Sequence, residues 1–273
     1  MARNSELFQY NRAAWDAQVD QENRWTVGAP PEAVASAREG NVSVLLTPTK
    51  PVPERWFEPL RGKNLLCLAS GGGQQGPLFA AAGAHVTVFD ASPRQLAQDR
   101  MVADREGLPL RTVEGDMRDL HPFDDETFDL IFHPCSNSFV DEILPVWQEA
   151  FRVLRPSGRL LAGVAQPFAW VLDPDAAAAG RVTMKYPTRN LQSGAPHRDL
   201  LDLTPEDRTR YEAAQEPLGV AHSLTAQLGG QLRAGFQLLD LYEDNAGEES
   251  DENKTMSKFF DPYLATLALR PES

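Results

Sequence analysis

The sequence has 273 residues, of which 42% are hydrophobic and 24% are charged. This composition is typical of a folded protein with one large or two small domains, and it excludes a disordered or fibrous chain. The formal net charge of −13 opposes contact with phosphate backbones and anionic lipid surfaces. We therefore expect no nucleic-acid partner and no membrane association.

Cysteine usage and the N-terminal sequence bear on the compartment. The two cysteines, Cys67 and Cys135, cannot form a disulfide framework. The first ten residues lack the apolar core of a signal peptide, and no run approaches the ~18 apolar residues of a membrane span. These features predict a soluble cytoplasmic protein. The histidines and cysteines show no metal-ligand spacing, so we expect no metal.

The first sixty residues differ from the rest of the chain. Apolar residues at helical spacing predict one helix over Asn4–Val19 and a second, shorter helix over Ala33–Arg38. Three prolines in Thr47–Pro53 predict an extended connector. We interpret residues 1–61 as a helical cap that precedes the main domain, residues 62–273.

From Asn64 the chain alternates between strand and helix periodicities. Strands are expected at Asn64–Ala69, His85–Asp90, Leu110–Asp116, Phe128–His133 and Arg159–Ala165. Helices are expected at Gln75–Gly83 and from Pro93 to Glu106, the latter with Ser92 as N-cap and Gln95 completing a capping box. A further helix is expected after a cap at Asp141 and before Pro156-Ser157-Gly158. This alternation predicts an α/β fold with a Rossmann-like, doubly wound parallel sheet.

The C-terminal part departs from this alternation. Residues 166–220 lack clean periodicity and are expected to form an irregular insertion over the carboxyl edge of the sheet. A helix is predicted over Ser223–Ala234 and strands over Phe236–Tyr242 and Tyr263–Arg270. The acidic stretch between these strands is interpreted as a solvated loop without a helix, so the two strands should pair as an antiparallel hairpin.

The strongest local signal is Leu65–Gly76, LLCLASGGGQQG, in which a strand leads into glycines and then a helix. Glycines at such a turn let backbone N–H groups approach a ligand closely. Asp90 ends the next strand, where a carboxylate can accept hydrogen bonds from a ribose diol. Together they predict a nucleoside-binding crevice. The glycines also match G-x-G-x-x-G, which leaves a nicotinamide dinucleotide open.

The order of the motifs resembles that of class I S-adenosylmethionine-dependent methyltransferases from Asn64 to Arg270. The matching pieces are the glycine loop, Phe89–Ser92 (FDAS), Glu114–Met117 (EGDM), Phe128–Ile131 (FDLI) and Phe151–Gly158 (FRVLRPSG). The resemblance implies a seven-stranded sheet with an antiparallel last strand, and S-adenosylmethionine as the cofactor. Two positions depart from the family pattern: Cys67 stands where an acidic residue is usual, and Ala69 where glycine is usual.

The resemblance also implies roles for single residues. Ala69, Ser70, Gly71 and Gly73 are expected to line the methionine portion of the cofactor. Asp90 is expected to hold both ribose hydroxyls, with Ala91 and Ser92 next to the adenine. Asp116 is expected to accept a hydrogen bond from the adenine amine, with Met117 either packed on the ring or buried in the core.

His133 ends the fourth predicted strand, which would place it next to the reactive methyl group. Its unperturbed pKa of about 6.5 suits a general base, although a structural histidine is an equally good interpretation. Asn137 follows in the same polar cluster and is a candidate for orienting a substrate. In the cap, Tyr10, Trp15 and Trp25 are candidates for an aromatic wall over the acceptor.

The sequence thus predicts an enzyme that transfers a methyl group from S-adenosylmethionine directly to a small molecule. Two alternatives remain open: an NAD-dependent oxidoreductase, and a non-catalytic nucleoside-binding module of the same fold. The acceptor and the oligomeric state are not determined by these patterns.

Overall fold

The computed structural model describes residues 6–185, 197–248 and 250–272. Within them, seven strands form one mixed sheet in the order β3-β2-β1-β4-β5-β9-β8. The strands are β1 (Asn64–Leu68), β2 (His85–Asp90), β3 (Leu110–Glu114), β4 (Phe128–His133), β5 (Leu154–Ala165), β8 (Gln237–Asp244) and β9 (Tyr263–Leu269). The first five are parallel, and β9 runs antiparallel to both β5 and β8. The predicted fold class is confirmed.

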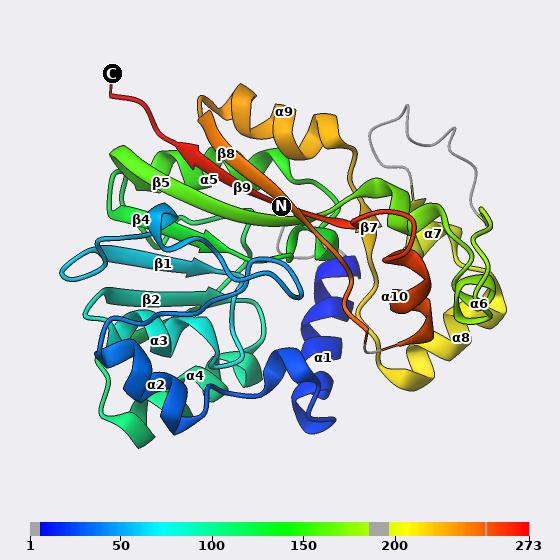
Figure 1. Ribbon diagram of the computed structural model, residues 1–273, viewed down its shortest axis with the longest axis horizontal. Coiled ribbons are helices and arrows are strands. Elements are labelled where there is room, and N and C mark those ends of the chain that lie inside the picture. Colours follow the sequence, from blue (N-terminus) through cyan, green and yellow to red (C-terminus); the bar gives the residue numbers. More distant parts are fainter. Residues whose placement is uncertain (1–5, 186–196, 249, 273) are drawn as a thin grey trace.

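Helices cover both faces of the sheet (Figure 1). One face packs against α3 (Gln75–Ala81) and α4 (Pro93–Glu106), and the other against α5 (Leu144–Val153) and α9 (Leu224–Ala234). The central strands are almost continuously apolar because each of their faces lies against one of these helical layers. The carboxyl ends of β1–β5 therefore meet at a single edge, where a ligand site is expected.

Local sequence signals set the ends of α4. The Ser92 hydroxyl accepts a hydrogen bond from the Gln95 backbone N–H at 3.0 Å, Pro93 occupies the first turn, and Gly107 closes the helix in the left-handed conformation. The expected cap of α5 by Asp141 is wrong. Asp141 forms an ion pair with Arg118 instead, and Ile143 precedes the helix without a side-chain cap.

Part of the N-terminal segment lies across the carboxyl edge of the sheet, whereas residues 31–38 pack beside α3 on one face. It contains α1 (Glu6–Asp20), η2 (Arg24–Thr26), α2 (Pro31–Arg38) and η3 (Glu54–Trp56). In Figure 1 the blue helix α1 stands beyond the tips of the β1 and β2 arrows. Both expected helices are found, but the expectation of an extended connector is wrong. The segment turns back on itself at the sheet edge, where the Val52 N–H donates to the Val44 carbonyl at 3.0 Å and Leu45 pairs with Pro51.

The insertion after β5 is more regular than expected. It holds η5 (Pro167–Val171), α6 (Pro174–Ala178), α7 (Asp199–Asp202), α8 (Pro205–Ala214) and the short antiparallel pair β6 (His197–Arg198) and β7 (Val220–Ala221). Residues 186–196 of the predicted insertion lie outside the described residues.

The expectation that no helix separates the last two strands is also wrong. Helix α10 (Asp251–Met256) lies there, with Ser250 as its N-cap. Its single buried apolar side chain, Met256, packs with Leu172 and Ala246, which explains why no helical periodicity was visible. No helix in the described part of the chain is both long and apolar enough to cross a membrane.

Candidate active site

The glycine loop between β1 and α3 is held by the carboxylate at the end of β2. The Gly71 N–H donates to Asp90 Oδ2 at 2.9 Å. A Cβ at position 71 would lie 3.1 Å from that carboxylate oxygen and 2.7 Å from the Cβ of Gln95. Glycine is therefore the residue that lets the loop pass between these two side chains.

Asp90 has acceptor capacity beyond the loop. Its Oδ1 accepts from the Ser92 N–H at 2.9 Å, so backbone amides engage both oxygens, and a carboxylate with about four lone-pair sites can still accept from a ligand. Burial raises the pKa of Asp90 above its ordinary value, opposed by the backbone amides of Ser92, Gly71 and Ala91. A ligand diol can supply the further donors that favour the charged form.

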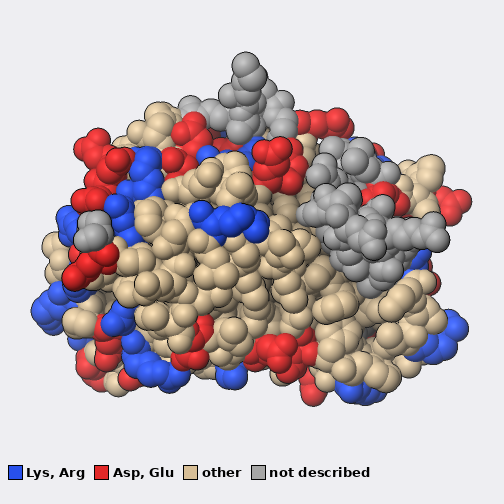
Figure 2. Space-filling model, turned by 90° about the horizontal axis from the view of Figure 1, so that it is seen from above, with Lys and Arg blue, Asp and Glu red and all other residues tan. Residues whose placement is uncertain are grey.

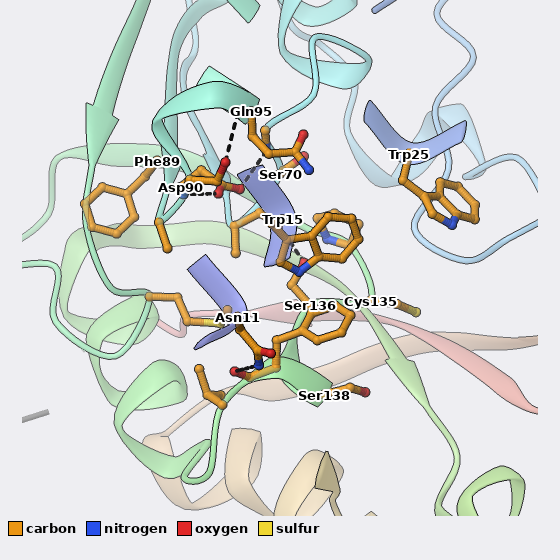
Figure 3. A pocket seen from close by; sticks show the side chains of 18 of the residues that line it. Asn11, Trp15, Trp25, Ser70, Phe89, Asp90, Gln95, Cys135, Ser136 and Ser138 are labelled. Carbon is orange, nitrogen blue, oxygen red and sulfur yellow. Dashed lines mark hydrogen bonds between the residues drawn. The ribbon is translucent and has the colours of Figure 1, made fainter. Parts of the chain in front are cut away.

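Ser92 ties α4 to the N-terminal helix. Its hydroxyl caps Gln95 and donates to Asp16 of α1 at 2.6 Å. The capping box is only half formed, because Asp90 takes the Ser92 N–H that the Gln95 side chain would accept. The Gln95 amide instead lies in the pocket wall (Figure 3), where its Oε1 has no hydrogen-bond partner among the described residues.

The N-terminal segment forms the opposite wall of the pocket. Trp15 packs edge-on against Phe139 with ring centroids 5.1 Å apart. The guanidinium of Arg24 stacks over the ring of Trp25 at 4.2 Å. Figure 3 shows Trp15 beside the group formed by Ser70, Asp90 and Gln95, with Trp25 standing apart from it.

Hydrogen bonds fasten this wall to the glycine loop. Gln74 Nε2 donates to the backbone carbonyls of Arg24 and Val27, at 2.6 and 3.2 Å. The Ala29 N–H donates to the Gly73 carbonyl at 2.8 Å. The wall over the site is therefore connected directly to the loop beneath it.

Together these elements enclose a cavity of about 350 Å³ along the carboxyl edge. Ten residues expected at the site line it: Ala69, Ser70, Gly71, Asp90, Ala91, Ser92, Asp116, Met117, Trp15 and Trp25. Four other candidates are not among the described lining residues: Gly73, His133, Tyr10 and Asn137.

The placement of His133 argues against the role of general base and against direct contact with the cofactor. Its side chain is fully buried under the pocket floor. Nδ1 lies 2.9 Å from the Leu68 carbonyl and Nε2 lies 2.8 Å from Asn137 Oδ1, so both ring nitrogens are engaged. Burial lowers the pKa of His133, opposed by these two contacts. The ring packs edge-on against Trp147 of α5, as a structural histidine does.

The other three candidates contact protein groups. Asn137 of η4 (Asn137–Phe139) bridges His133 and Gln227. Tyr10 packs in a small cluster with Leu7 and Leu218. Gly73 lies against the backbone of α4, where a Cβ would be 2.8 Å from the Gln98 carbonyl oxygen.

Asp116 lines the pocket, but its carboxylate is already paired. Arg118 donates to it from Nε at 3.0 Å and from Nη2 at 2.7 Å, and the Arg118 N–H adds a third bond at 2.9 Å. This part of the pocket therefore has a rigid, charge-compensated wall beside Met117.

Residues without a motif complete the pocket. They come from the connector and the two residues before it (Leu45, Leu46, Thr47, Pro48), from α1 (Phe8, Asn11, Arg12), and from β5, β9 and the segments after β4 and β5 (Cys135, Ala165, Trp170, Tyr263). Asn11 bonds backbone groups at Phe139 and Leu218, so α1 is locked onto two distant loops. The proline-rich connector was the one sequence signal for this part of the wall.

A Rossmann-like sheet with an antiparallel end, a glycine loop and a carboxylate at the end of β2 defines a nucleoside-cofactor protein. A family profile described as a methyltransferase domain matches residues 66–162. The uncharacterised methyltransferase YbaJ of Bacillus subtilis strain 168 is 44% identical over 264 residues, covering 97% of this chain and 98% of the relative.

Two solved structures share the fold. An S-adenosylmethionine-dependent methyltransferase from Mesorhizobium loti aligns with a TM-score of 0.60 and 18% identity, over 79% of this chain and 94% of that one. The 1,6-didemethyltoxoflavin-N1-methyltransferase of Burkholderia thailandensis, with bound S-adenosylhomocysteine, aligns with a TM-score of 0.55 and 16% identity, over 98% and 90%.

The chain belongs to the class I S-adenosylmethionine-dependent methyltransferase family, and S-adenosylmethionine is its cofactor. The residues present fit that cofactor. The Asp90 carboxylate lines the pocket and can accept a further hydrogen bond, and the buried Gln95 Oε1 has no hydrogen-bond partner in the described part of the chain.

Proposed function

We propose that this methyltransferase acts on a small molecule. The observation that carries the proposal is the wall formed by the N-terminal segment, which covers the carboxyl edge and is bonded to the glycine loop at Gln74 and Gly73. A covered cavity lined by convergent side chains admits a small acceptor, whereas a polymer needs an open groove.

The cofactor half of the pocket is assigned to β1–β3. Ala69, Ser70 and Gly71 would hold the methionine portion, Asp90 the ribose hydroxyls, and Ala91, Ser92 and Met117 the adenine. When bound, the cofactor supplies a methyl group on a positively charged sulfur, which is already activated for transfer. Support comes from the position of all these residues in the lining and from the free acceptor capacity of Asp90.

The protein's own contribution to catalysis would be positioning and exclusion of water. The rings of Trp15 and Trp25 close the pocket, and aromatic faces attract a sulfonium. We do not assign a general base to His133, because both its ring nitrogens bond groups beneath the pocket.

Charge supports a small molecule over a nucleic acid. The chain carries a net charge of −13. On the face drawn in Figure 2, acidic and basic side chains are interspersed around a broad uncharged area rather than gathered into one basic patch. Tracking a phosphate backbone requires such a patch.

The test asks which class of molecule receives the labelled methyl group. The protein is incubated with methyl-tritiated S-adenosylmethionine and bacterial lysate, and the lysate is then separated into small molecules, nucleic acid and protein. We expect enzyme-dependent label in the small-molecule fraction, reduced in Asp90→Asn. Label confined to nucleic acid or protein would overturn the proposal.

A further inference from the structure

The pocket continues beyond the cofactor half toward β5 and β9. The sheet order places β2 and β3 on one side of the central β1/β4 pair and β5 and β9 on the other. The loop after β4 forms the boundary, where Ser136 Oγ donates to the Ala69 carbonyl at 2.6 Å. Cys135 lies on the far side of this boundary (Figure 3). We call this far part, beyond Ser136, the acceptor half.

A strap made by residues 44–52 gives the acceptor half a fixed wall. Asp244, at the end of β8, accepts the backbone N–H groups of Thr49 and Lys50, each at 2.9 Å. The strap rests directly on β5, since a Cβ at Gly163 would lie 2.0 Å from the Leu46 carbonyl oxygen. The cavity on this side is therefore formed before any acceptor arrives. Asp244 belongs to the stretch interpreted as a solvated loop, yet it is only 4% exposed.

The described side chains that line the acceptor half are uncharged. They are Leu45, Leu46, Thr47, Pro48, Cys135, Ala165, Trp170 and Tyr263. Burial raises the pKa of the Cys135 thiol, which keeps that group neutral as well. A charged acceptor placed among these groups would lose hydration without gaining an ion partner.

The aromatic side chains in the lining favour a planar ligand. Trp170 brings a ring from the insertion and Tyr263 brings one from β9. Aromatic walls gain most from flat rings that can stack or meet them edge-on. We propose that the acceptor half binds an uncharged, planar ring system, aromatic or heteroaromatic. This inference rests on the proposed function, because it names the class of small molecule that is methylated.

Three probes of one size separate charge from planarity. Binding of 2-naphthol, naphthalene-2-sulfonate and decahydro-2-naphthol is measured by calorimetry on the full chain saturated with S-adenosylhomocysteine. We expect 2-naphthol to bind at least about tenfold more tightly than either of the other two. Equal or tighter binding of the sulfonate, or of the saturated alcohol, would overturn the inference.

Two variants place the binding in this half of the pocket. Ala165→Phe fills the space at the end of β5, so it should abolish 2-naphthol binding while S-adenosylhomocysteine still binds, which also shows that the variant folds. Ala213→Phe, on the exposed side of α8, is the matched control and should bind both. Retained naphthol binding in Ala165→Phe would contradict the assignment.

Leu45→Arg adds a cation to the half-buried strap and is the second variant. It should shift the preference from 2-naphthol toward the sulfonate, and an unchanged preference would count against the inference. The label partition described above separates the two claims. If small molecules are labelled but the probes do not show the expected preference, only this inference fails. If label is found only in nucleic acid or protein, the proposed function fails.

Discussion

The Gly71 N–H donates to the Asp90 carboxylate at 2.9 Å, so the glycine loop and the end of β2 act as one unit. The loop cannot shift without breaking a bond to the same carboxylate that is proposed to hold the ribose. Cofactor affinity and loop geometry should therefore respond together to a change at Asp90.

Asp90→Asn tests this unit. The amide keeps the shape of the side chain but replaces one accepting oxygen by an NH2 donor, so we expect S-adenosylhomocysteine binding to weaken by about 1.5–3 kcal/mol. Calorimetry measures the change, with the exposed Asp104→Asn on α4 as a matched control. An unchanged dissociation constant in a folded variant would remove Asp90 from the site.

Asp99 lies behind the same loop and should make stability depend on pH. Its side chain is fully buried, and burial raises its pKa well above the ordinary range, opposed in part by the amides of Gly73 and Gly72. As pH rises from about 3.9 toward the raised value, the unfolded chain loses this proton while the folded chain keeps it, so stability falls.

The variant Asp99→Asn removes that loss. We expect it to gain stability relative to the wild type by about 1.4 kcal/mol per pH unit within this window, as measured by urea unfolding at several pH values. Asp104→Asn serves again as the control. A stability difference that stays flat with pH would show that Asp99 ionises normally in the folded protein.

His133 should show the opposite pH dependence. Burial lowers its pKa, so below about pH 6.5 the unfolded chain takes up a proton that the folded chain refuses, and stability falls as pH falls. His133→Gln should cost about 1–3 kcal/mol at pH 7.5 through its lost contacts to Leu68 and Asn137, and the cost should shrink toward pH 5.5. The exposed His85→Gln is the control.

A kinetic readout separates this structural role from catalysis. The pH profile of methyl transfer should keep its shape in His133→Gln. If the variant instead loses the rise or fall in rate near neutral pH, His133 acts as a general base.

The sequence could not show where the His133 side chain points, although the alternation along β4 holds the reason. Leu130 and Phe132 face one core, and Ile131 faces the other. His133 shares the parity of Ile131 and so turns toward Trp147 and α5 rather than upward into the pocket. Strand position alone placed it at the correct edge, but not in the site.

Local patterns were sufficient to place Gly71, Asp90 and Ser92 at the pocket, but they gave no signal for the wall formed by the strap. Gly71, Asp90 and Ser92 lie close in sequence, and their roles follow from one strand-turn-helix unit after another. The strap depends on Asp244, almost two hundred residues after Thr49, and on the flat surface at Gly163. Contacts of such long range leave no periodic trace in the sequence.

Gln74 connects the glycine loop to η2 and should control closure over the cofactor. Gln74→Ala removes the bonds to Arg24 and Val27, so we expect S-adenosylhomocysteine to dissociate several-fold faster, equivalent to about 1 kcal/mol. Stopped-flow tryptophan fluorescence measures the rate, with Gln237→Ala at the exposed start of β8 as the control. Identical dissociation rates would mean that the wall does not hold the cofactor.

The central claim is that one pocket, floored by the glycine loop and walled by the N-terminal segment, binds the cofactor. Hydrogen exchange of the full chain with and without S-adenosylhomocysteine tests it most directly. The account predicts joint protection of residues 69–76, 90–95 and 115–117 together with residues 8–27. Protection of the first three segments while residues 8–27 exchange as in the free protein would contradict it.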